Sequence, residues 1–504
     1  MSESIETIRR LHAWSEGKPT LRGETVNVFI GDDDDILIVA FLRMGGESRP
    51  WGVAFGKPDE KPKILTVAEG RNRTRVGDMM VEFAPELLQH FRHPQHSDDP
   101  LSDWKTNSHR QIWLPGPTHV EMLHYIALSY ARTRWDRDGV ETLKALGNLA
   151  NCLYIEQQRP GQQTVFTAAN ALRETYVFPA SSVRQAHLGY LLGWLQGGRT
   201  RETRLAAARA AENISVATVL DPEFERKKIQ PLIEEWGQAN QDDNEKGRAG
   251  AEASVRRLLS PELLRRWELT RDSIAHLRSD KRQPNPGLLE LVSLSRENLN
   301  RVWGENAMND DEGGDAYWPG TLTEPNTRMA AGGFHEREGD DQKARHYLVH
   351  GDRELQREEL AKGHGIIGTI SAVSTEEPAW KIRYSYPELL TIREGKSLVI
   401  AGASDMQLTV IEIDNQTQTL IAKPNWTRTK KRFGKNGLPP EDRSWKGREL
   451  VFLEFQPLFI AGQLTNAAKR RSDDPNDVTN LIKSPRRKHA ANDDDGPIIS
   501  ESAE

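Results

Sequence analysis

The sequence predicts an α+β protein of several domains, and three observations support this fold class. Residues 363–455 contain short runs of Val, Ile, Thr and aromatic residues separated by Gly, Asn and Asp, which is typical of a small closed sheet. Residues 25–67 also contain strand-like runs joined by turn sequences. Between about 118 and 303 the apolar residues instead recur at helical spacing.

These patterns divide the 504 residues into five segments. We expect an N-terminal α+β domain at 1–110, with an antiparallel sheet plus a helix, and a central helical domain at 111–303. A linker at 304–342 has too little apolar content to fold alone. A C-terminal β-barrel domain of the OB or SH3 type, with a leading helix, follows at 343–460, and a disordered tail at 461–504.

Capping residues predict where several helices begin and end. Thr118 stands three residues before Glu121, which is the capping-box pattern. Ser260 followed by Pro261 predicts a second helix start, with Ser as the N-cap. Gly363 is expected to close a short helix before the barrel. Residues 1–17 predict an amphipathic helix whose apolar stripe is Ile5, Ile8, Leu11 and Trp14.

Composition argues against several classes of protein. No run approaches 18 consecutive apolar residues, which predicts no membrane span, and the first residues lack the apolar core of a secretory signal. The single cysteine, Cys152, excludes an internal disulfide and a cysteine zinc cage, so a cytoplasmic location is expected. The net charge of -6 gives no global attraction to nucleic acid, but the charges are polarised along the chain.

The segment between the last two predicted barrel strands is basic and contains aromatic residues. Cations in such a segment neutralise phosphates, and aromatic faces stack on unpaired bases. The alternative is a solvated basic loop whose aromatic side chains pack back on the sheet. The candidate nucleic-acid contacts are Trp426, Arg428, Lys430, Lys431, Arg432, Phe433, Lys435, Trp445, Lys446 and Arg448.

We find no convincing catalytic or metal-binding constellation, and no cofactor is predicted. The G-x-G-x-x-G pattern at Gly363, Gly365 and Gly368 follows a helix and precedes a strand, the reverse of the dinucleotide fingerprint. A helix C-cap followed by close strand packing explains these glycines better. The acidic run at 32–35 is more simply a solvated turn, and a proline interrupts the histidines between 90 and 96.

Three stretches of the barrel segment carry a resemblance to a known family. They are the G-x-I-x-x-V opening at 368–373, LTIREGKSLVIAG at 390–402 and LTVIEIDNQTQTLIA at 408–422. Residues 363–422 resemble the small β-barrel attached to the motor core of superfamily 1 helicases of the nonsense-mediated-decay type. In that family the barrel contacts nucleic acid and modulates the motor. The helicase motifs that should follow are absent after Phe455, so the resemblance implies an accessory subunit or a split helicase partner.

The sequence therefore predicts a non-catalytic nucleic-acid-binding and scaffolding subunit of a bacterial multi-protein system, with phage defence as one setting by analogy. Its expected partners are DNA or RNA at the basic segment and a separate ATPase, helicase or nuclease. Two alternatives stay open. One is a protein–protein adaptor whose helical middle docks a partner, and the other is a divergent metal-dependent nuclease or hydrolase that uses Asp33 or His93.

Overall fold

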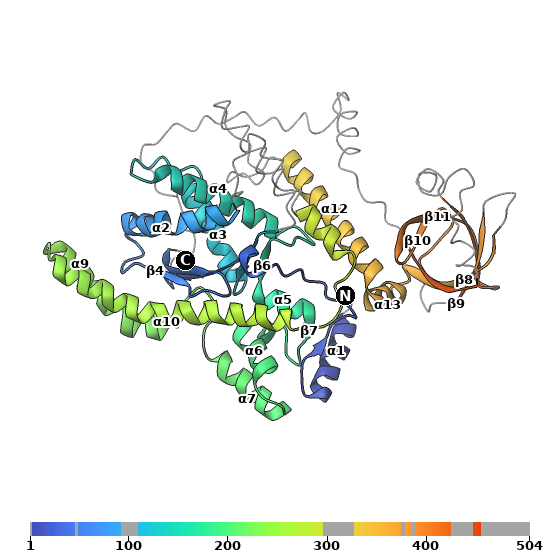
Figure 1. Ribbon diagram of the computed structural model, residues 1–504, viewed down its shortest axis with the longest axis horizontal. Coiled ribbons are helices and arrows are strands. Elements are labelled where there is room, and N and C mark those ends of the chain that lie inside the picture. The colour runs from blue at the N-terminus through green and yellow to red at the C-terminus, as the bar shows by residue number, and fades with distance from the viewer. Residues whose placement is uncertain are drawn as a thin grey trace, which may run out of the picture.

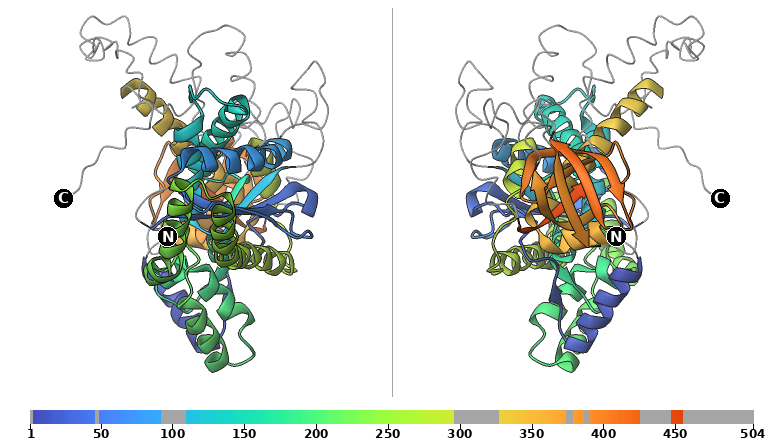
Figure 2. Two further views of the ribbon diagram at one scale, coloured as in Figure 1. Left: turned by 90° about the vertical axis from the view of Figure 1, so that its left-hand side faces the viewer. Right: turned by 90° about the vertical axis from the view of Figure 1, so that its right-hand side faces the viewer.

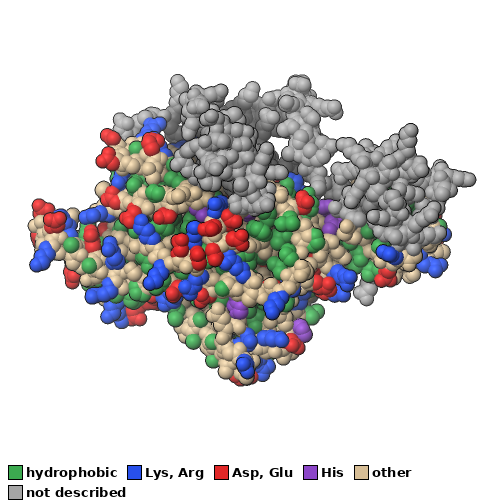
Figure 3. Space-filling model, in the orientation of Figure 1, with side chains coloured by type: hydrophobic (Ala, Val, Ile, Leu, Met, Phe, Trp, Pro, Cys, Tyr) green, Lys and Arg blue, Asp and Glu red, His purple; other side chains and the backbone are tan. Residues whose placement is uncertain are grey.

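The computed structural model describes residues 3–45, 49–91, 109–295, 327–373, 379–385, 390–424 and 447–454. Within these ranges the chain is an α+β protein, as predicted. A mixed sheet covered by helices forms the body, and a closed β-barrel lies at one end of the molecule, beyond α13 (Figure 1). On the face seen in Figure 3, acidic and basic side chains are interspersed over the body, in keeping with the nearly balanced charge.

The sheet of the body has five strands in the order β4-β3-β2-β5-β6. β2 (Ile36–Arg43), β3 (Pro50–Gly56) and β4 (Lys63–Thr66) form the expected antiparallel meander. β5 (Gln111–Leu114) and β6 (Val165–Thr167) then add in parallel beyond β2. The sheet is therefore mixed, and the prediction of a purely antiparallel sheet is corrected. These two strands have only four and three residues inside a helix-rich region, so the sequence pattern did not reveal them.

Helices cover both faces of this sheet. α2 (Arg73–Phe91), α3 (Pro117–Tyr130) and α4 (Val140–Gln157) lie over one face, and α10 (Glu245–Arg278) crosses the other (Figure 1). With both faces covered, β2 is buried from Ile36 to Leu42, which explains its continuous apolar sequence. Residues on both sides of position 110 contribute to one hydrophobic core, which extends from Val28 to Leu277.

The remaining elements of the body are small helices and one short strand pair around this core. They include α1 (Glu3–Glu16), β1 (Thr20–Leu21), α5 (Ala168–Thr175), β7 (Tyr176–Val177), α6 (Leu188–Gln196), α7 (Arg201–Glu212), α8 (Pro222–Phe224) and α9 (Gln230–Gln241). No helix in the described ranges is both long enough and apolar enough to cross a lipid bilayer.

The predicted capping box at the start of α3 is wrong. The helix begins at Pro117 with Gly116 as its N-cap, and that cap makes no side-chain hydrogen bond. The hydroxyl of Thr118 is used elsewhere, because its Oγ1 accepts a hydrogen bond from the backbone N–H of Thr218 at 3.2 Å. The Thr118 side chain therefore makes a tertiary hydrogen bond in place of the helix cap that the local pattern predicted.

The predicted helix start at Ser260 and Pro261 is also wrong, since α10 runs through both residues. Val255, Leu259 and Leu263 are all buried, so one apolar face continues on either side of the proline. Pro261 itself lies on the exposed face of the helix. Burial of the apolar face outweighs the roughly 3 kcal/mol that an interior proline costs.

The C-terminal barrel has six antiparallel strands that close in the order β10-β11-β12-β9-β8-β13, and it faces the viewer in the right panel of Figure 2. Its alternating side chains fill the interior, so that Trp380, Ile382 and Tyr384 of β9 are buried and their neighbours are exposed. The strands are β8 (Gly365–Val373), β9 (Trp380–Ser385), β10 (Ser397–Ile400), β11 (Ala403–Asp414), β12 (Thr419–Pro424) and β13 (Glu449–Glu454).

The glycine pattern before and inside β8 serves packing, as expected. Gly363 has φ 79° just after α13, a conformation that favours glycine. A Cβ at Gly365 would lie 2.7 Å from the carbonyl oxygen of Phe452, and one at Gly368 would lie 2.7 Å from the Ile382 side chain. These positions therefore exclude side chains so that strands can approach closely.

Two helices join the body to the barrel. α12 (Thr327–Gly351) includes residues 327–342 of the predicted linker, and α13 (Arg353–Ala361) follows it. Val349 of α12 packs with Val399 and Leu453 of the barrel in a small apolar cluster, and Leu355 of α13 adds to it. On the other side, Arg9 of α1 forms an ion pair with Glu358 of α13 at 2.8 Å.

The carboxylate of Asp352 connects these helices to the N-terminal segment. Its Oδ1 caps α13 by accepting from the N–H groups of Glu354 at 2.9 Å and Leu355 at 3.3 Å. Its Oδ2 accepts from the N–H groups of Glu24 at 3.1 Å and Thr25 at 3.0 Å, and from the Thr25 hydroxyl at 2.6 Å. Burial alone would raise the pKa of Asp352, but these hydrogen bonds outweigh it and lower the pKa.

Replacing Asp352 should loosen both segments that its carboxylate holds. In Asp352→Asn a single amide oxygen can serve only one side, so about 1–3 kcal/mol of local stability should be lost. We expect amide hydrogen exchange at Glu24, Thr25, Glu354 and Leu355 to accelerate by about 5- to 150-fold. Asp59→Asn, at an exposed turn, removes the same charge and should leave these rates unchanged. Unchanged exchange in Asp352→Asn would contradict the proposed role.

His119 is fully buried beneath β2. Its Nδ1 accepts from the Phe41 N–H at 3.0 Å, and its Nε2 donates to the Val216 carbonyl at 3.1 Å. Burial lowers the pKa of His119 to about 3. The folded protein therefore keeps this ring neutral, whereas the unfolded chain protonates it below its ordinary pKa of 6.5.

The free energy of unfolding should consequently fall as the pH drops from 6.5 toward 3, by about 1.4 kcal/mol per pH unit for this group. His119→Gln should be less stable than the parent at pH 7, and the difference should shrink by about 2 kcal/mol at pH 5. Urea unfolding followed by tryptophan fluorescence measures both values. His12→Gln, at an exposed histidine, is the control. An equal difference at the two pH values would show that His119 is not held neutral.

Candidate nucleic-acid interface

The predicted nucleic-acid segment is inserted at one end of the barrel. It leaves the sheet after Pro424, the last residue of β12, and returns at Gly447, just before β13. The register of the strands places Trp380 of β9 beside Ala422 and Val373 of β8 beside Trp380. We call this end of the barrel, where β12 finishes and β9 and β13 begin, the loop end.

Lysines on β9 and β12 project outward near the loop end. The alternation of β9 places Lys381 and Arg383 outside, because Trp380, Ile382 and Tyr384 fill the interior. In the antiparallel register, Lys381 is paired with Ile421 of β12, and Lys423 lies two residues further along on the same exposed side. The barrel core therefore fixes the direction of these cations.

Arg448 stands at the rim of the same end. The neighbouring Gly447 donates its N–H to the carbonyl of Ile370 at 3.2 Å, and Glu449 is paired with Thr369 of β8. Arg448 is exposed and immediately follows the inserted segment. Three cations therefore border the point of insertion, namely Lys381, Lys423 and Arg448.

These three cations and Arg383 form no ion pair or hydrogen bond with the residues that the structure describes. We call Lys381, Arg383, Lys423 and Arg448 the cationic strip. Other lysines near the barrel are paired, as in Lys396 with Glu454 at 2.5 Å and Lys362 with Glu359 at 2.8 Å. An unpaired cation is available to an anionic partner without first breaking an internal contact.

Acidic side chains also lie on the barrel, and one of them, Glu449, is exposed at the loop end next to Arg448. Asp414 is opposite Thr419, at the other end of β12. Glu412 is opposite Ile421, which is also the partner of Lys381, so Glu412 and Lys381 lie at the same level of the barrel. The Asp414 carboxylate accepts from the Thr417 hydroxyl at 2.6 Å and from the Gln416 N–H at 2.8 Å, and these bonds lower the pKa of Asp414. The carboxylate is therefore engaged in its own turn, and the charge of Lys381 makes a smaller contribution to the lowered pKa.

The sequence adds more charge at this end. Residues 425–446 contain two acids, Glu441 and Asp442, against seven cations. The β8–β9 connection contributes Glu376 and Glu377 in sequence. Cations remain in clear excess when the strip is included. The seven are Arg428, Lys430, Lys431, Arg432, Lys435, Arg443 and Lys446.

Of the ten predicted contact residues, only Arg448 is among those that the structure describes. Trp426, Arg428, Lys430, Lys431, Arg432, Phe433, Lys435, Trp445 and Lys446 lie outside the described residues. Lys381, Arg383 and Lys423 were not predicted. The alternation in WKIRYS was the signal that would have found the first two, since it puts both cations on one outward face.

The residues behind the metal-dependent alternative have other partners. Three of the four acids in the run 32–35 pair with cations from other parts of the chain. His90 places its Nε2 2.9 Å from the Gln111 carbonyl. Burial lowers the pKa of His90 to about 3, while His93 lies outside the described residues. Among described side chains, no three His, Cys, Asp or Glu are grouped to hold a metal ion. The acidic pairs are Asp33–Arg278, Asp34–Lys57 and Asp35–Arg110.

The comparisons with known proteins leave the chain without an assigned relative. No known protein family, no curated protein and no solved structure matches it.

Proposed function

We propose that this protein is a non-catalytic nucleic-acid-binding and scaffolding subunit that works beside a separate ATPase, helicase or nuclease. The observation that carries the proposal is the loop end of the barrel. Three cations that form no ion pair or hydrogen bond with the described residues border the point where the basic, aromatic segment 425–446 is inserted. Long loops between the strands of small barrels are a common place for nucleic-acid contacts.

The described barrel surface supports separate roles for its strands, which would contact phosphates, and for the inserted segment, which would stack on bases. On β9 the aromatic side chains, Trp380 and Tyr384, are buried in the core, so this strand offers cations and no outward ring. Lys381, Lys423 and Arg448 would contact phosphates. Stacking on bases would come from Trp426, Phe433 and Trp445 of the inserted segment. Binding of this kind favours single strands, whose bases are free to stack, over a closed duplex.

The way the barrel is mounted supports the scaffolding part of the proposal. α13 contacts β8 and β13 of the barrel on one side. On its other side it is held by Arg9 of α1 and by the Asp352 carboxylate at Thr25. A nucleic acid bound at the loop end would therefore be held in a defined position relative to the body.

A second function, that of a protein–protein adaptor, is favoured by a different observation. The predicted apolar stripe of α1 is largely exposed, with Ile8 65%, Leu11 64% and Trp14 42% accessible. Adjacent exposed apolar side chains of this size are typical of surfaces that bind other proteins. The two functions are compatible, because α1 and the loop end belong to different parts of the molecule (Figure 1).

Charge reversal at the loop end should weaken nucleic-acid binding and reduce its dependence on salt. The double variant Lys381→Glu with Lys423→Glu removes two described cations, and Lys430→Glu with Lys431→Glu and Arg432→Glu tests the inserted segment. For a single strand, each lost phosphate contact should lower the slope of log K against log salt by about 0.7, so the double variant should lose about 1.4. Fluorescence anisotropy with labelled single-stranded and duplex DNA and RNA, at several salt concentrations, measures this.

The matched control is Lys246→Glu with Lys281→Glu, which reverses two exposed lysines on the body. It should leave affinity and slope close to those of the parent. If the barrel variants bind as the parent does, the loop end is not the site. If the parent binds none of the four probes at low salt, the nucleic-acid function fails and the adaptor function becomes the leading one.

A further inference from the structure

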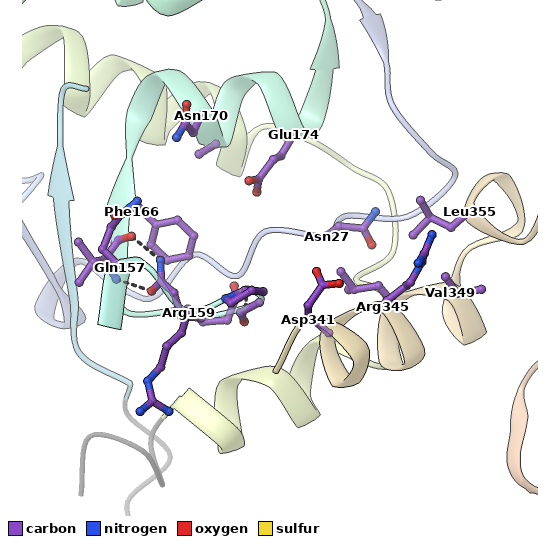
Figure 4. Close-up of a pocket in the computed structure, with 18 of the residues that line it drawn as sticks. Asn27, Gln157, Arg159, Phe166, Asn170, Glu174, Asp341, Arg345, Val349 and Leu355 are labelled. Atoms are coloured by element: carbon purple, nitrogen blue, oxygen red, sulfur yellow. Dashed lines mark hydrogen bonds between the residues drawn. The ribbon is translucent and has the colours of Figure 1, made fainter. Parts of the chain in front are cut away.

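A cavity of about 620 Å³ lies between the body and the two connecting helices. One wall is formed by α5 and the segment before β6, and the opposite wall by α12 and α13 (Figure 4). Its volume is in the range of pockets that hold small organic molecules. The cavity is separate from the loop end of the barrel and contains none of the cationic strip.

The cations in the wall of this cavity are already neutralised. Arg345 and Lys362 both pair with Glu359, at 3.0 and 2.8 Å. Arg159 is almost buried and lies 3.5 Å from Glu156 and 3.4 Å from Asp340. A phosphate or carboxylate ligand would have to displace one of these carboxylates, so the cavity is poorly suited to an anion.

The acids in the wall are only partly neutralised. Glu358 is paired with Arg9 at 2.8 Å. Glu174 and Asp341 have no ion pair or hydrogen bond with the described residues. Figure 4 shows them on opposite walls, with Glu174 reaching in from α5 and Asp341 reaching in from α12. The charge still available to a ligand is therefore negative, and it is present at two points.

The state of Glu174 fits the absence of a partner. Its side chain can be reached by solvent through the cavity, yet the surrounding protein raises its pKa, and Arg173 and Arg22 offset this only in part. A raised pKa means that the charged form of the carboxylate is disfavoured, and a cation placed beside it would stabilise that charged form. Phe166, Leu348 and Val349 add apolar surface to the lining, and Asn170 adds an amide on the α5 side.

We propose that this cavity binds a small aliphatic dication of the polyamine class. One ammonium group would pair with Glu174, the other with Asp341, and the methylene chain would cross the cavity between them. Such a ligand joins α5 of the body to α12. It would therefore help to hold α12, whose Val349 packs against Val399 and Leu453 of the barrel, in place on the body.

Isothermal titration calorimetry with putrescine, which is a dication, and with spermidine, which carries a third ammonium group, tests the proposal on the full chain, purified free of nucleic acid. About 150 mM salt screens weak binding to exposed acids. We expect saturable binding at one site. Glu174→Gln and Asp341→Asn should each weaken it at least about tenfold, and the double variant should abolish it. Glu338→Gln changes an acid on the same helix that is exposed, as Asp341 is, but does not line the cavity, and this variant should bind as the parent does.

Three results would overturn the proposal. The first is that neither amine binds, and the second is that the parent and both cavity variants bind equally well. The third is that ATP binds in the cavity and competes with the amine for the site at Glu174 and Asp341. Far-UV circular dichroism and thermal unfolding without ligand establish that each variant is folded. If a variant unfolds, Glu174→Asp replaces Glu174→Gln, since it keeps the charge while withdrawing it by one methylene, and an intermediate affinity is then expected.

Discussion

The arrangement of the barrel on the body depends on the carboxylate of Asp352. It caps α13 through the Glu354 and Leu355 N–H groups and holds the 24–25 segment through three further hydrogen bonds. The residues that it joins are more than 300 positions apart in the sequence. Since five donors share one buried carboxylate, the start of α13 cannot move without breaking contacts on the body. The backbone at Gly23 approaches this carboxylate so closely that a Cβ there would lie 2.7 Å from Asp352 Oδ2.

A second polar residue repeats this role nearby. The Asn285 amide donates to Leu348 of α12 and to Asn27, both at 2.8 Å. The Asn285 oxygen accepts from the Gly287 N–H at 3.0 Å. Residues from the N-terminal segment, the region after α10 and the end of α12 thus meet at one polar junction. The same junction closes one side of the cavity and sets the position from which the barrel starts.

Much of the fold could be predicted from the sequence, because its strongest signals are local. The alternation in WKIRYS and the turn sequences of residues 363–422 predicted strands, and these strands close into a barrel. The apolar runs before residue 67 predicted the meander of β2, β3 and β4. The short parallel strands β5 and β6 could not be predicted, because their four and three residues carry too little pattern. The capping box predicted at Thr118 and the helix start predicted at Pro261 were wrong for a related reason, because tertiary contacts overrode a local capping preference.

The candidate site was predictable only in part. Clustered cations with interspersed aromatics marked 425–446 without any knowledge of the fold. Lys381 and Lys423 join that cluster only once strand pairing is known, because 42 positions separate two residues that the register brings to one surface. Glu174 and Asp341 gave no sequence signal, since each is an ordinary acid on a helix until α12 is placed against α5. Sites assembled from distant elements require the tertiary structure.

Hydrogen–deuterium exchange of the full chain, with and without a single-stranded oligonucleotide, tests the central claim most directly. If the loop end is the working surface, protection should appear in peptides that cover the start of β9, the end of β12 and residues 425–448, while β2 and α10 of the body should exchange as before. Protection confined to the body, with the barrel peptides unchanged in saturating oligonucleotide, would contradict the account.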